Sequence, residues 1–328
     1  MQNFPVDEFK SWFLEVKRDF PWRDTPTPYE VWVSEIMLQQ TRASVVVPYF
    51  LRWMEEFPSI ESLAAAPLEK IIKIWEGLGY YSRARNLHEG AKYIMENFGG
   101  ELPSREEELK KIKGLGPYTI GAILSFAFYQ KKAAVDGNVY RVISRYFLSE
   151  KDVPALTERV LPDHEPYIVM EGLIELGALV CTKKPQCFIC PLKEGCLARA
   201  KGMTESIPVL KVKKKTIVLL RHIGILRFDK YVLVRKEKTG KVMADLYEFP
   251  YFEEQIHSGM LFDLEVSYQG DLPKVTHTFT KYRAHLYPSV WEVHSREDVE
   301  GYEWILSDEL KKLPFSSGHR KILHILEL

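Results

Sequence analysis

The sequence predicts two parts of different fold class, an all-helical region over residues 1–200 and an α+β domain over residues 217–328. Apolar residues recur at helical spacing throughout the first part, and no segment there alternates convincingly between polar and apolar side chains. Alternating segments rich in β-branched and aromatic residues begin at Ile217. Between the two parts, residues 201–216 contain Pro208 and a basic run, which indicates a solvated linker.

The composition fits a cytoplasmic protein with compact cores. With 328 residues and 46% hydrophobic content, the chain has room for two or three domains. No apolar run is long enough to cross a membrane, and the N-terminus lacks the basic and then apolar pattern of a secretion signal. Because the formal net charge is zero, any binding to nucleic acid would depend on local patches and backbone donors, in the cytoplasm or on the nucleoid.

Prolines separate the predicted helices at the start of the chain. An amphipathic helix is expected over residues 5–20, and the proline-broken loop after it contains Trp22 and Arg23. Further helices are expected over residues 31–50, 51–67 and 68–75.

Glu35 lies in the helix expected over residues 31–50, beside Met37 and Leu38. An apolar neighbourhood disfavours the charged form of a carboxyl group and raises its pKa, which suits a general acid near neutral pH. A solvated glutamate on a helix face is the commoner explanation of such a residue, so Glu35 by itself does not indicate a catalytic acid.

Two tight glycine turns follow. The first, at residues 77–79, is followed by Tyr80 and by further aromatic and basic residues, a mixture that can stack on bases and contact phosphates. A core aromatic pair explains it equally well. The second turn, Gly114 to Gly116, joins a short basic helix to an apolar helix over residues 118–128. Glycines permit positive φ, and the free N–H groups of the next helix favour a phosphate, so we expect a phosphate clamp that reads no sequence.

Asp136 comes directly before a helix expected over residues 137–147. An aspartate in that place is usually a helix cap. Two more helices are expected over residues 155–161 and 165–180, and the second carries Glu171 and Ile174 on one face.

All four cysteines lie within residues 181–196, at Cys181, Cys187, Cys190 and Cys196. Thiols so close together in a chain without a secretion signal indicate metal ligands, not disulfides. Zinc sites usually have two C-x-x-C pairs, and only Cys187 and Cys190 form one. The spacing therefore favours an iron–sulfur cluster, which needs four spread thiolates.

The second part is expected to contain several short strands and two helices. The strands are expected over residues 217–228, 230–237, 246–252, 274–293 and 302–307. The helices are expected near residues 253–263 and 307–328.

Several long motifs occur in one order and together resemble those of the A/G-specific adenine DNA glycosylases, the MutY family of helix-hairpin-helix glycosylases. Besides the cysteine cluster, the motifs are PWR at 21–23, SEIMLQQT at 34–41, WEGLGYYSRARNL at 75–87, GLGPYTIGA at 114–122, VDGNVYRV at 135–142 and ELGALVC at 175–181.

The resemblance implies a helix-hairpin-helix glycosylase region with six-helix-barrel and iron–sulfur subdomains, followed by a Nudix-like domain that recognises 8-oxoguanine. It implies a monomer that binds duplex DNA containing adenine opposite 8-oxoguanine or guanine. The adenine would be flipped out and its N-glycosidic bond cleaved, and the mispair lowers the cost of unstacking.

The resemblance also implies roles for individual residues. Glu35 would protonate the adenine, and Asp136, with Asn138 as its neighbour, would stabilise the oxocarbenium-like sugar. The residues implied to shape the adenine pocket are Trp22, Arg23, Leu38, Tyr118, Glu171 and Ile174. Gln40 and Tyr80 would wedge into the base stack, Gly114 and Gly116 would hold phosphate, and the four cysteines would hold a [4Fe–4S] cluster.

The chain departs from the family pattern in three places. Five residues separate Cys181 from Cys187 where the family usually has six. The usual Phe-Ser-His of the second domain stands here as Phe279-Thr280-Lys281, which puts 8-oxoguanine selectivity in doubt. No full Nudix box is present, so no nucleotide hydrolysis is expected.

Three other functions were weighed. In the related endonuclease III-like lyases a lysine that forms a Schiff base stands where this chain has Tyr118, which argues against a bifunctional glycosylase/lyase. Retention of both Glu35 and Asp136 argues against a non-catalytic iron–sulfur DNA-binding protein. Without the resemblance, a helical metal-binding scaffold with a β-rich partner-binding domain would remain.

Overall fold

The computed structural model describes residues 4–23, 26–209, 216–237, 243–257, 259–279 and 281–327. The chain divides into two compact units. Unit 1 comprises Met1–Ala65 and Asn86–Val212, and unit 2 comprises Ala66–Arg85 and Lys213–Leu328. The short segment Ala66–Arg85 therefore groups with the C-terminal part although the helical part surrounds it in sequence. The domain boundaries expected at residues 201–216 stay a prediction, and residues 210–215 of that linker lie outside the described residues.

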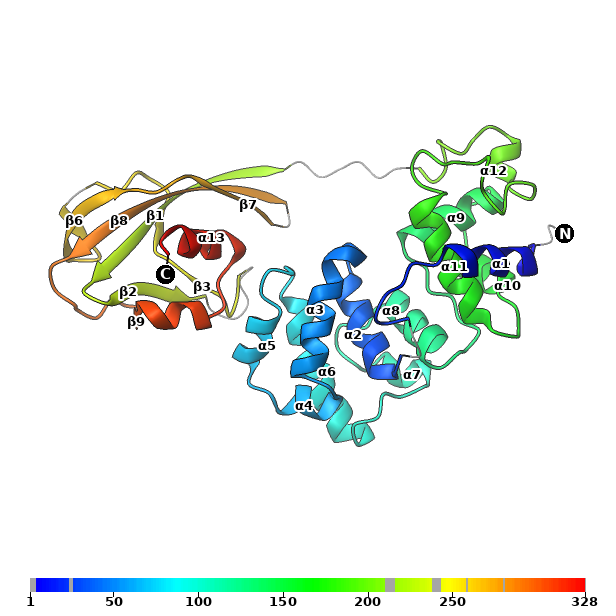
Figure 1. The fold of residues 1–328 in the computed structure, drawn as a ribbon, viewed down its shortest axis with the longest axis horizontal. Coiled ribbons are helices and arrows are strands. Elements are labelled where there is room, and N and C mark those ends of the chain that lie inside the picture. Colours follow the sequence, from blue (N-terminus) through cyan, green and yellow to red (C-terminus); the bar gives the residue numbers. More distant parts are fainter. Residues whose placement is uncertain are drawn as a thin grey trace. The chain divides into compact units, whose positions relative to one another are not determined.

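The prediction of an all-helical first part is confirmed, because the residues described before Ile217 contain helices and no strand (Figure 1). In chain order these helices are α1 (Val6–Val16), α2 (Pro28–Leu38), α3 (Ala43–Glu56), α4 (Ile60–Ala65), α5 (Leu68–Ile74), α6 (Ser82–Phe98), α7 (Glu106–Leu109), α8 (Pro117–Ala122), a π-helix η1 (Ile123–Ala127), α9 (Gly137–Phe147), α10 (Val153–Val160), α11 (Pro166–Leu179) and α12 (Leu197–Ala200). No helix among the described residues is long and apolar enough to cross a membrane.

The prediction of a single helix over residues 31–50 is wrong. The chain forms α2 and α3 instead, and Gln40 between them has φ of 57°, which no helix interior tolerates. At its start, α2 is fixed by a capping box in which Thr27 accepts from the backbone of Glu30 and Glu30 binds back to Thr27. The helix expected over residues 5–20 ends early, at Val16, so that residues 17–23 form a loop.

Two glycines bring the elements of the site together. A Cβ on Gly121 of α8 would lie 2.1 Å from the carbonyl oxygen of Ala133, so only glycine lets this helix approach the strand-like segment before Asp136. A Cβ on Gly177 of α11 would lie 2.5 Å from Cβ of Asn138 and 2.9 Å from its backbone. Glycine is therefore required where α11 crosses the start of α9.

Unit 2 contains a mixed sheet with strand order β3-β2-β1-β8-β6-β5. Its strands are β1 (Ile217–Phe228), β2 (Tyr231–Lys236), β3 (Tyr247–Glu248), β4 (Tyr251–Phe252), β5 (Gly259–Leu261), β6 (Leu264–Asp271), β7 (Val275–Phe279), β8 (Tyr282–Val293) and β9 (Glu303–Leu306). The long strands β1 and β8 are parallel, and β7 pairs antiparallel with β8, Phe279 opposite Tyr282. The 3-10 helix η2 (Ser307–Lys312) and α13 (Ser317–Ile325) follow the sheet.

The prediction of a helix near residues 253–263 is wrong. The described residues there include β5, which pairs with β6 across a tight turn in which Phe262 and Asp263 both have positive φ. This hairpin geometry overrides any helical pattern. The terminal helix expected over residues 307–328 is found in part, as η2 and α13.

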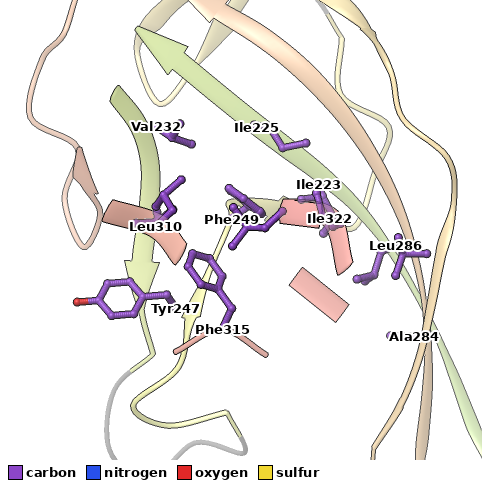
Figure 2. Packing of buried hydrophobic residues seen from close by; sticks show 13 residues of the cluster. Ile223, Ile225, Val232, Tyr247, Phe249, Ala284, Leu286, Leu310, Phe315 and Ile322 are labelled. Carbon is purple, nitrogen blue, oxygen red and sulfur yellow. The ribbon is translucent and has the colours of Figure 1, made fainter. Parts of the chain in front are cut away.

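One hydrophobic core of unit 2 lies between the sheet and its C-terminal helices. Figure 2 shows Phe249 close to Phe315, and their ring centroids lie 5.6 Å apart. Ile322 of α13 and Leu310 of η2 are fully buried in the same cluster, which also includes Ile223 of β1. The C-terminal helix is thus fixed to the sheet by buried apolar side chains.

Candidate active site

A cavity of about 100 Å³ opens in unit 1 between the loop after α1 and the helices α2, α8 and α11. It is lined by Arg18, Phe20, Trp22, Arg23, Val31, Ser34, Glu35, Leu38, Ala43, Tyr118, Phe126, Glu171 and Ile174. All the residues that the resemblance implied for an adenine pocket are therefore neighbours around one cavity, together with the expected acid.

Glu35 lies on α2 and its side chain is buried, with 6% of the residue exposed. Its Oε2 atom is buried and has no hydrogen-bond partner among the described residues. Burial is the main cause that raises the pKa of Glu35 to about 7. A hydrogen bond from Tyr118 and the charge of Arg23 lower this pKa, and the charges of Asp136 and Glu171 raise it. A carboxyl group in this state is protonated about half the time at neutral pH and has one oxygen free to meet a ligand.

Tyr118 is the second residue of α8, directly after the Gly114–Gly116 turn. Burial, and then the negative charges of Glu35 and Asp136, raise its pKa well above the ordinary value, so the phenol stays protonated. A protonated phenol donates a hydrogen bond and carries no amine that could form a Schiff base.

Asp136 is the N-cap of α9, as expected for an aspartate before a helix. Its Oδ1 accepts from the backbone N–H groups of Asn138 at 2.8 Å and Val139 at 2.7 Å, and Asn138 Nδ2 donates to its Oδ2 at 2.8 Å. Neither Asp136 nor Asn138 lines the cavity as described. Even so, the charge of Asp136 raises the pKa of Glu35, which places the two carboxylates in each other's field.

Arg23 and Arg18 line the cavity and both bind Glu175, a fully buried residue of α11. Arg23 Nη2 donates to Glu175 Oε2 at 2.8 Å, and Arg18 Nε donates to Oε1 at 2.5 Å. Burial opposes the ionisation of Glu175, but the hydrogen bonds and charges of both arginines outweigh it and lower its pKa. Arg23 also lies 3.8 Å from Glu171.

Arg18 and Phe126, which line the cavity, and Glu175, which binds both arginines, are among the residues of the site that were not predicted from the sequence. A signal for Glu175 exists in the chain, because it follows Glu171 by four residues and so shares its helix face. Phe126 lies in the π-helix η1, whose irregular geometry turns it toward the cavity, and no sequence pattern predicts that.

The other residues expected to contact DNA lie outside the cavity. Gln40 is exposed in the turn between α2 and α3, and Tyr80, which belongs to unit 2, is 43% exposed with φ of 49°. Gly114 has φ of 88°, as expected for the hairpin, but Gly116 has φ of −91°. Gly114 thus uses the positive φ that glycine permits, whereas Gly116 precedes Pro117 as the N-cap of α8, and the phosphate clamp stays a prediction.

The four cysteines are free thiols, and all four line one cavity together with Arg145 and residues of the loop between α11 and α12. Burial, and to a smaller extent the charges of the other three thiols, raise the pKa of Cys190 to about 12. Among the described residues, no three His, Cys, Asp or Glu side chains are grouped as ligands for a single metal ion. The four thiols share one cavity, and the group that they would hold there stays a prediction.

Unit 2 has a cavity of its own, of about 350 Å³, whose walls include Phe279, Arg221, Tyr251 and Glu248. Lys281 is exposed and lies over the ring of Tyr282, 5.3 Å from its centroid. Thr280, the middle residue of Phe279-Thr280-Lys281, lies outside the described residues.

Both parts of the chain are similar to known proteins. Residues 33–163 match the model of the HhH-GPD superfamily of base excision DNA repair proteins, and residues 222–324 match that of the NUDIX domain. An adenine DNA glycosylase of Buchnera aphidicola is 36% identical over 73% of this chain and 71% of its own length.

Two solved structures resemble the helical part. A thermostable thymine-DNA glycosylase matches with a TM-score of 0.57 and 30% identity over 60% of this chain and 95% of its own. An endonuclease III trapped as a covalent intermediate with DNA matches with a TM-score of 0.53 and 27% identity over 60% of this chain and 95% of its own. The chain therefore belongs to the adenine DNA glycosylases, base excision repair enzymes with a helix-hairpin-helix region and a Nudix-like C-terminal domain.

Proposed function

We propose that this chain excises adenine paired with 8-oxoguanine or guanine, by acid-assisted cleavage of the N-glycosidic bond and without cutting the DNA strand. The observation that carries the proposal is the buried Glu35 carboxyl group, whose Oε2 has no hydrogen-bond partner in the described part of the chain and whose pKa is raised to about 7. A buried oxygen left without a partner is costly, so a position of this kind is expected where a ligand supplies the missing partner.

In the proposed mechanism, adenine leaves the stack and enters the cavity between Glu35 and Tyr118. Protonated Glu35 donates its proton to a ring nitrogen of the base, so that adenine leaves as a neutral molecule. Arg23 and Glu171 at the cavity wall offer a donor and an acceptor that can recognise the edge of the base.

The sugar that remains carries positive charge as the bond breaks. Asp136 supplies the negative charge that stabilises it, since its carboxylate is held rigidly by two backbone N–H groups and by Asn138. A water then completes the hydrolysis. Because Tyr118 stands in place of a lysine, no Schiff base forms and the abasic strand stays intact.

We also assign the cysteine cavity to a [4Fe–4S] cluster held by Cys181, Cys187, Cys190 and Cys196. Support comes from the four free thiols around one space and from Arg145, whose Nη1 donates to Cys181 Sγ at 3.3 Å. Such a cluster would tie the loop between α11 and α12 into a fixed shape. The residues around it hold that loop and take no part in the chemistry at Glu35.

The remaining expected roles belong to DNA binding. Gly114 and Gly116 offer backbone donors to a phosphate, while the exposed Gln40 and Tyr80 are placed in tight turns suited to wedging between bases. Phe279 and Lys281 would contact the base opposite the adenine. One asymmetric DNA duplex per active site favours a monomer, acting in the cytoplasm on the nucleoid.

The first test is single-turnover adenine release from duplexes with adenine opposite 8-oxoguanine, guanine or cytosine. We expect release opposite 8-oxoguanine and guanine and little opposite cytosine. Borohydride trapping on abasic DNA is expected to give no efficient covalent adduct. No release from any duplex would contradict the glycosylase assignment, and a strong adduct would show a lyase.

A further inference from the structure

The segment that carries Tyr80 is attached to the C-terminal fold. Helix α5 and the turn after it belong to unit 2, with the sheet, η2 and α13. Lys73 of α5 donates to the carbonyl oxygens of Lys311 at 2.7 Å and Leu313 at 3.0 Å, which belong to the end of η2. At the other end of the segment, Arg85 donates to Asp245 Oδ2 at 3.0 Å and to the carbonyl oxygen of Ala244 at 3.1 Å.

Glu76 forms the strongest of these contacts. Its Oε1 accepts from Arg320 Nε at 2.6 Å and its Oε2 accepts from Arg320 Nη2 at 3.0 Å, so the ion pair is bidentate. The backbone N–H of Phe315 also donates to Oε1 at 3.2 Å. The side chains of Glu76 and Arg320 are only 12% and 17% exposed. A bidentate, largely buried pair has a defined geometry, which exposed ion pairs lack.

The turn after Glu76 is itself held by hydrogen bonds. The indole N–H of Trp75 donates to the carbonyl oxygen of Gly79 at 2.9 Å, and the N–H of Gly77 donates to Tyr81 Oη at 3.1 Å. Within this framework Tyr80 has φ of 49° and remains exposed. The direction of its ring therefore depends on the turn, and the position of the turn on unit 2 depends on Glu76.

On its other side, α13 contacts the strand that carries Phe279. A Cβ on Gly318 would lie 3.2 Å from Cβ of His277 on β7, so the helix lies directly against this strand. The next residue, His319, accepts from the backbone N–H of Phe249 at 3.0 Å, which fixes the helix to the sheet core. Arg320 thus lies on a helix that touches β7 with one residue and the Tyr80 turn with another.

We propose that Glu76 and Arg320 are positioning residues that dock the Tyr80 turn on α13, so that the strand bearing Phe279 and the turn bearing Tyr80 move as one piece. This inference rests on the proposed function for the roles of Tyr80 and Phe279 on DNA. The pair of Glu76 and Arg320 would then let the C-terminal domain influence the rate of adenine excision. Two sites that contact the same helix are coupled only if breaking the contact between them changes the behaviour of both sites.

The first experiment tests docking without using activity. Hydrogen exchange by mass spectrometry is measured on full-length protein for Glu76→Gln, Arg320→Gln and the double variant. Exchange of the amides of residues 75–82 is expected to speed up about tenfold in each single variant and no further in the double variant. Glu69→Gln is the matched control, since its pair with Lys236 is longer, at 3.4 Å, and more exposed.

The second experiment measures single-turnover adenine release in Tyr80 and Tyr80→Ala backgrounds. With Tyr80 present, Glu76→Gln is expected to slow release about tenfold, within the usual range of coupling between sites. With Tyr80→Ala, it is expected to change the rate less than about twofold, because the residue that it positions is gone.

Unchanged exchange in the turn of both single variants would overturn the docking role. An equal slowing in both backgrounds would overturn the link to Tyr80. If the wild type released no adenine while exchange responded as expected, the proposed function would fail and the docking would stand.

Discussion

Each unit buries a glutamate in the wall of a cavity, and the two glutamates have opposite environments. Glu248 in unit 2 is 6% exposed, like Glu35 in unit 1. Arg235 donates to Glu248 Oε1 from Nε at 2.8 Å and from Nη2 at 2.5 Å, whereas Glu35 Oε2 has no hydrogen-bond partner among the described residues.

The difference separates a structural carboxylate from one available for chemistry. Burial raises the pKa of both glutamates, and for Glu248 the positive charge of Arg235 opposes the rise. Both donors of Arg235 reach one oxygen of Glu248, so this carboxyl group serves to hold its neighbour in place. A carboxyl group with a free oxygen and a pKa near neutral can give away a proton, which is what cleavage of the adenine bond requires.

The largest expected effect follows from exchanging each glutamate for glutamine. Glu35→Gln should lower the single-turnover rate of adenine release about a thousandfold, because it removes the general acid, and should leave DNA binding intact. Glu248→Gln should instead cost about 1–3 kcal/mol of stability by weakening the bond to Arg235. Rates and thermal melts of both variants check this, and a Glu248→Gln enzyme as slow as Glu35→Gln would refute the contrast.

The pH dependence sharpens the same comparison. Since Glu35 must be protonated to act, adenine release should fall about tenfold per pH unit above its pKa of about 7. A flat rate from pH 6 to pH 9 would contradict the role of Glu35 as the acid.

Stability should depend on pH in a related way. The folded pKa of Glu35 is raised from 4.5 to about 7, so the native state holds a proton that the unfolded state has lost between these values. The wild type should therefore lose stability as pH rises from about 4.5 through 7, by up to roughly 3 kcal/mol. Glu35→Gln lacks this loss and should melt higher than the wild type at pH 8 but not at pH 4.

An intermediate effect is expected from Glu175→Gln. The substitution leaves Arg18 and Arg23 without their shared carboxylate, which should cost about 2 kcal/mol and slow adenine release about tenfold as Arg23 leaves its place. The matched control is Glu165→Gln at the N-cap of the same helix, whose more exposed pair with Lys10 should be worth less than about 0.5 kcal/mol. Equal melts for the two variants would show that burial of Glu175 does not matter.

The smallest effect is expected from a substitution in unit 2. Lys281 is exposed, and a lysine that contacts a phosphate strengthens binding to every duplex equally. Lys281→Ala should therefore weaken binding similarly for all duplexes. It should also lower the number of ions released on binding, taken from the slope of log K against log salt, by about one. Binding titrations at several salt concentrations measure this. Loss of preference for 8-oxoguanine with an unchanged salt slope would indicate a base contact instead.

The amino-acid order by itself determined the helix after Asp136, which spans Gly137–Phe147 as expected, and the long strand that begins at Ile217. These elements depend on local signals, a capping aspartate and an alternating run of β-branched residues, and local signals can be read from neighbouring residues. The motifs also named several residues that line the cavity of unit 1, because a motif is recognised from residue types and their order alone.

Only the tertiary structure decided how those residues are used. The bonds of two arginines to Glu175 and of Arg320 to Glu76 join segments far apart in the chain. The burial of Glu35 Oε2 without a hydrogen-bond partner among the described residues also depends on which distant segments surround it. The break at Gln40 likewise ends a continuous helical pattern that nothing in the adjacent residues interrupts. Burial and hydrogen-bond partners depend on which distant segments meet, and that contact sets the pKa of Glu35 and with it the chemistry of the site.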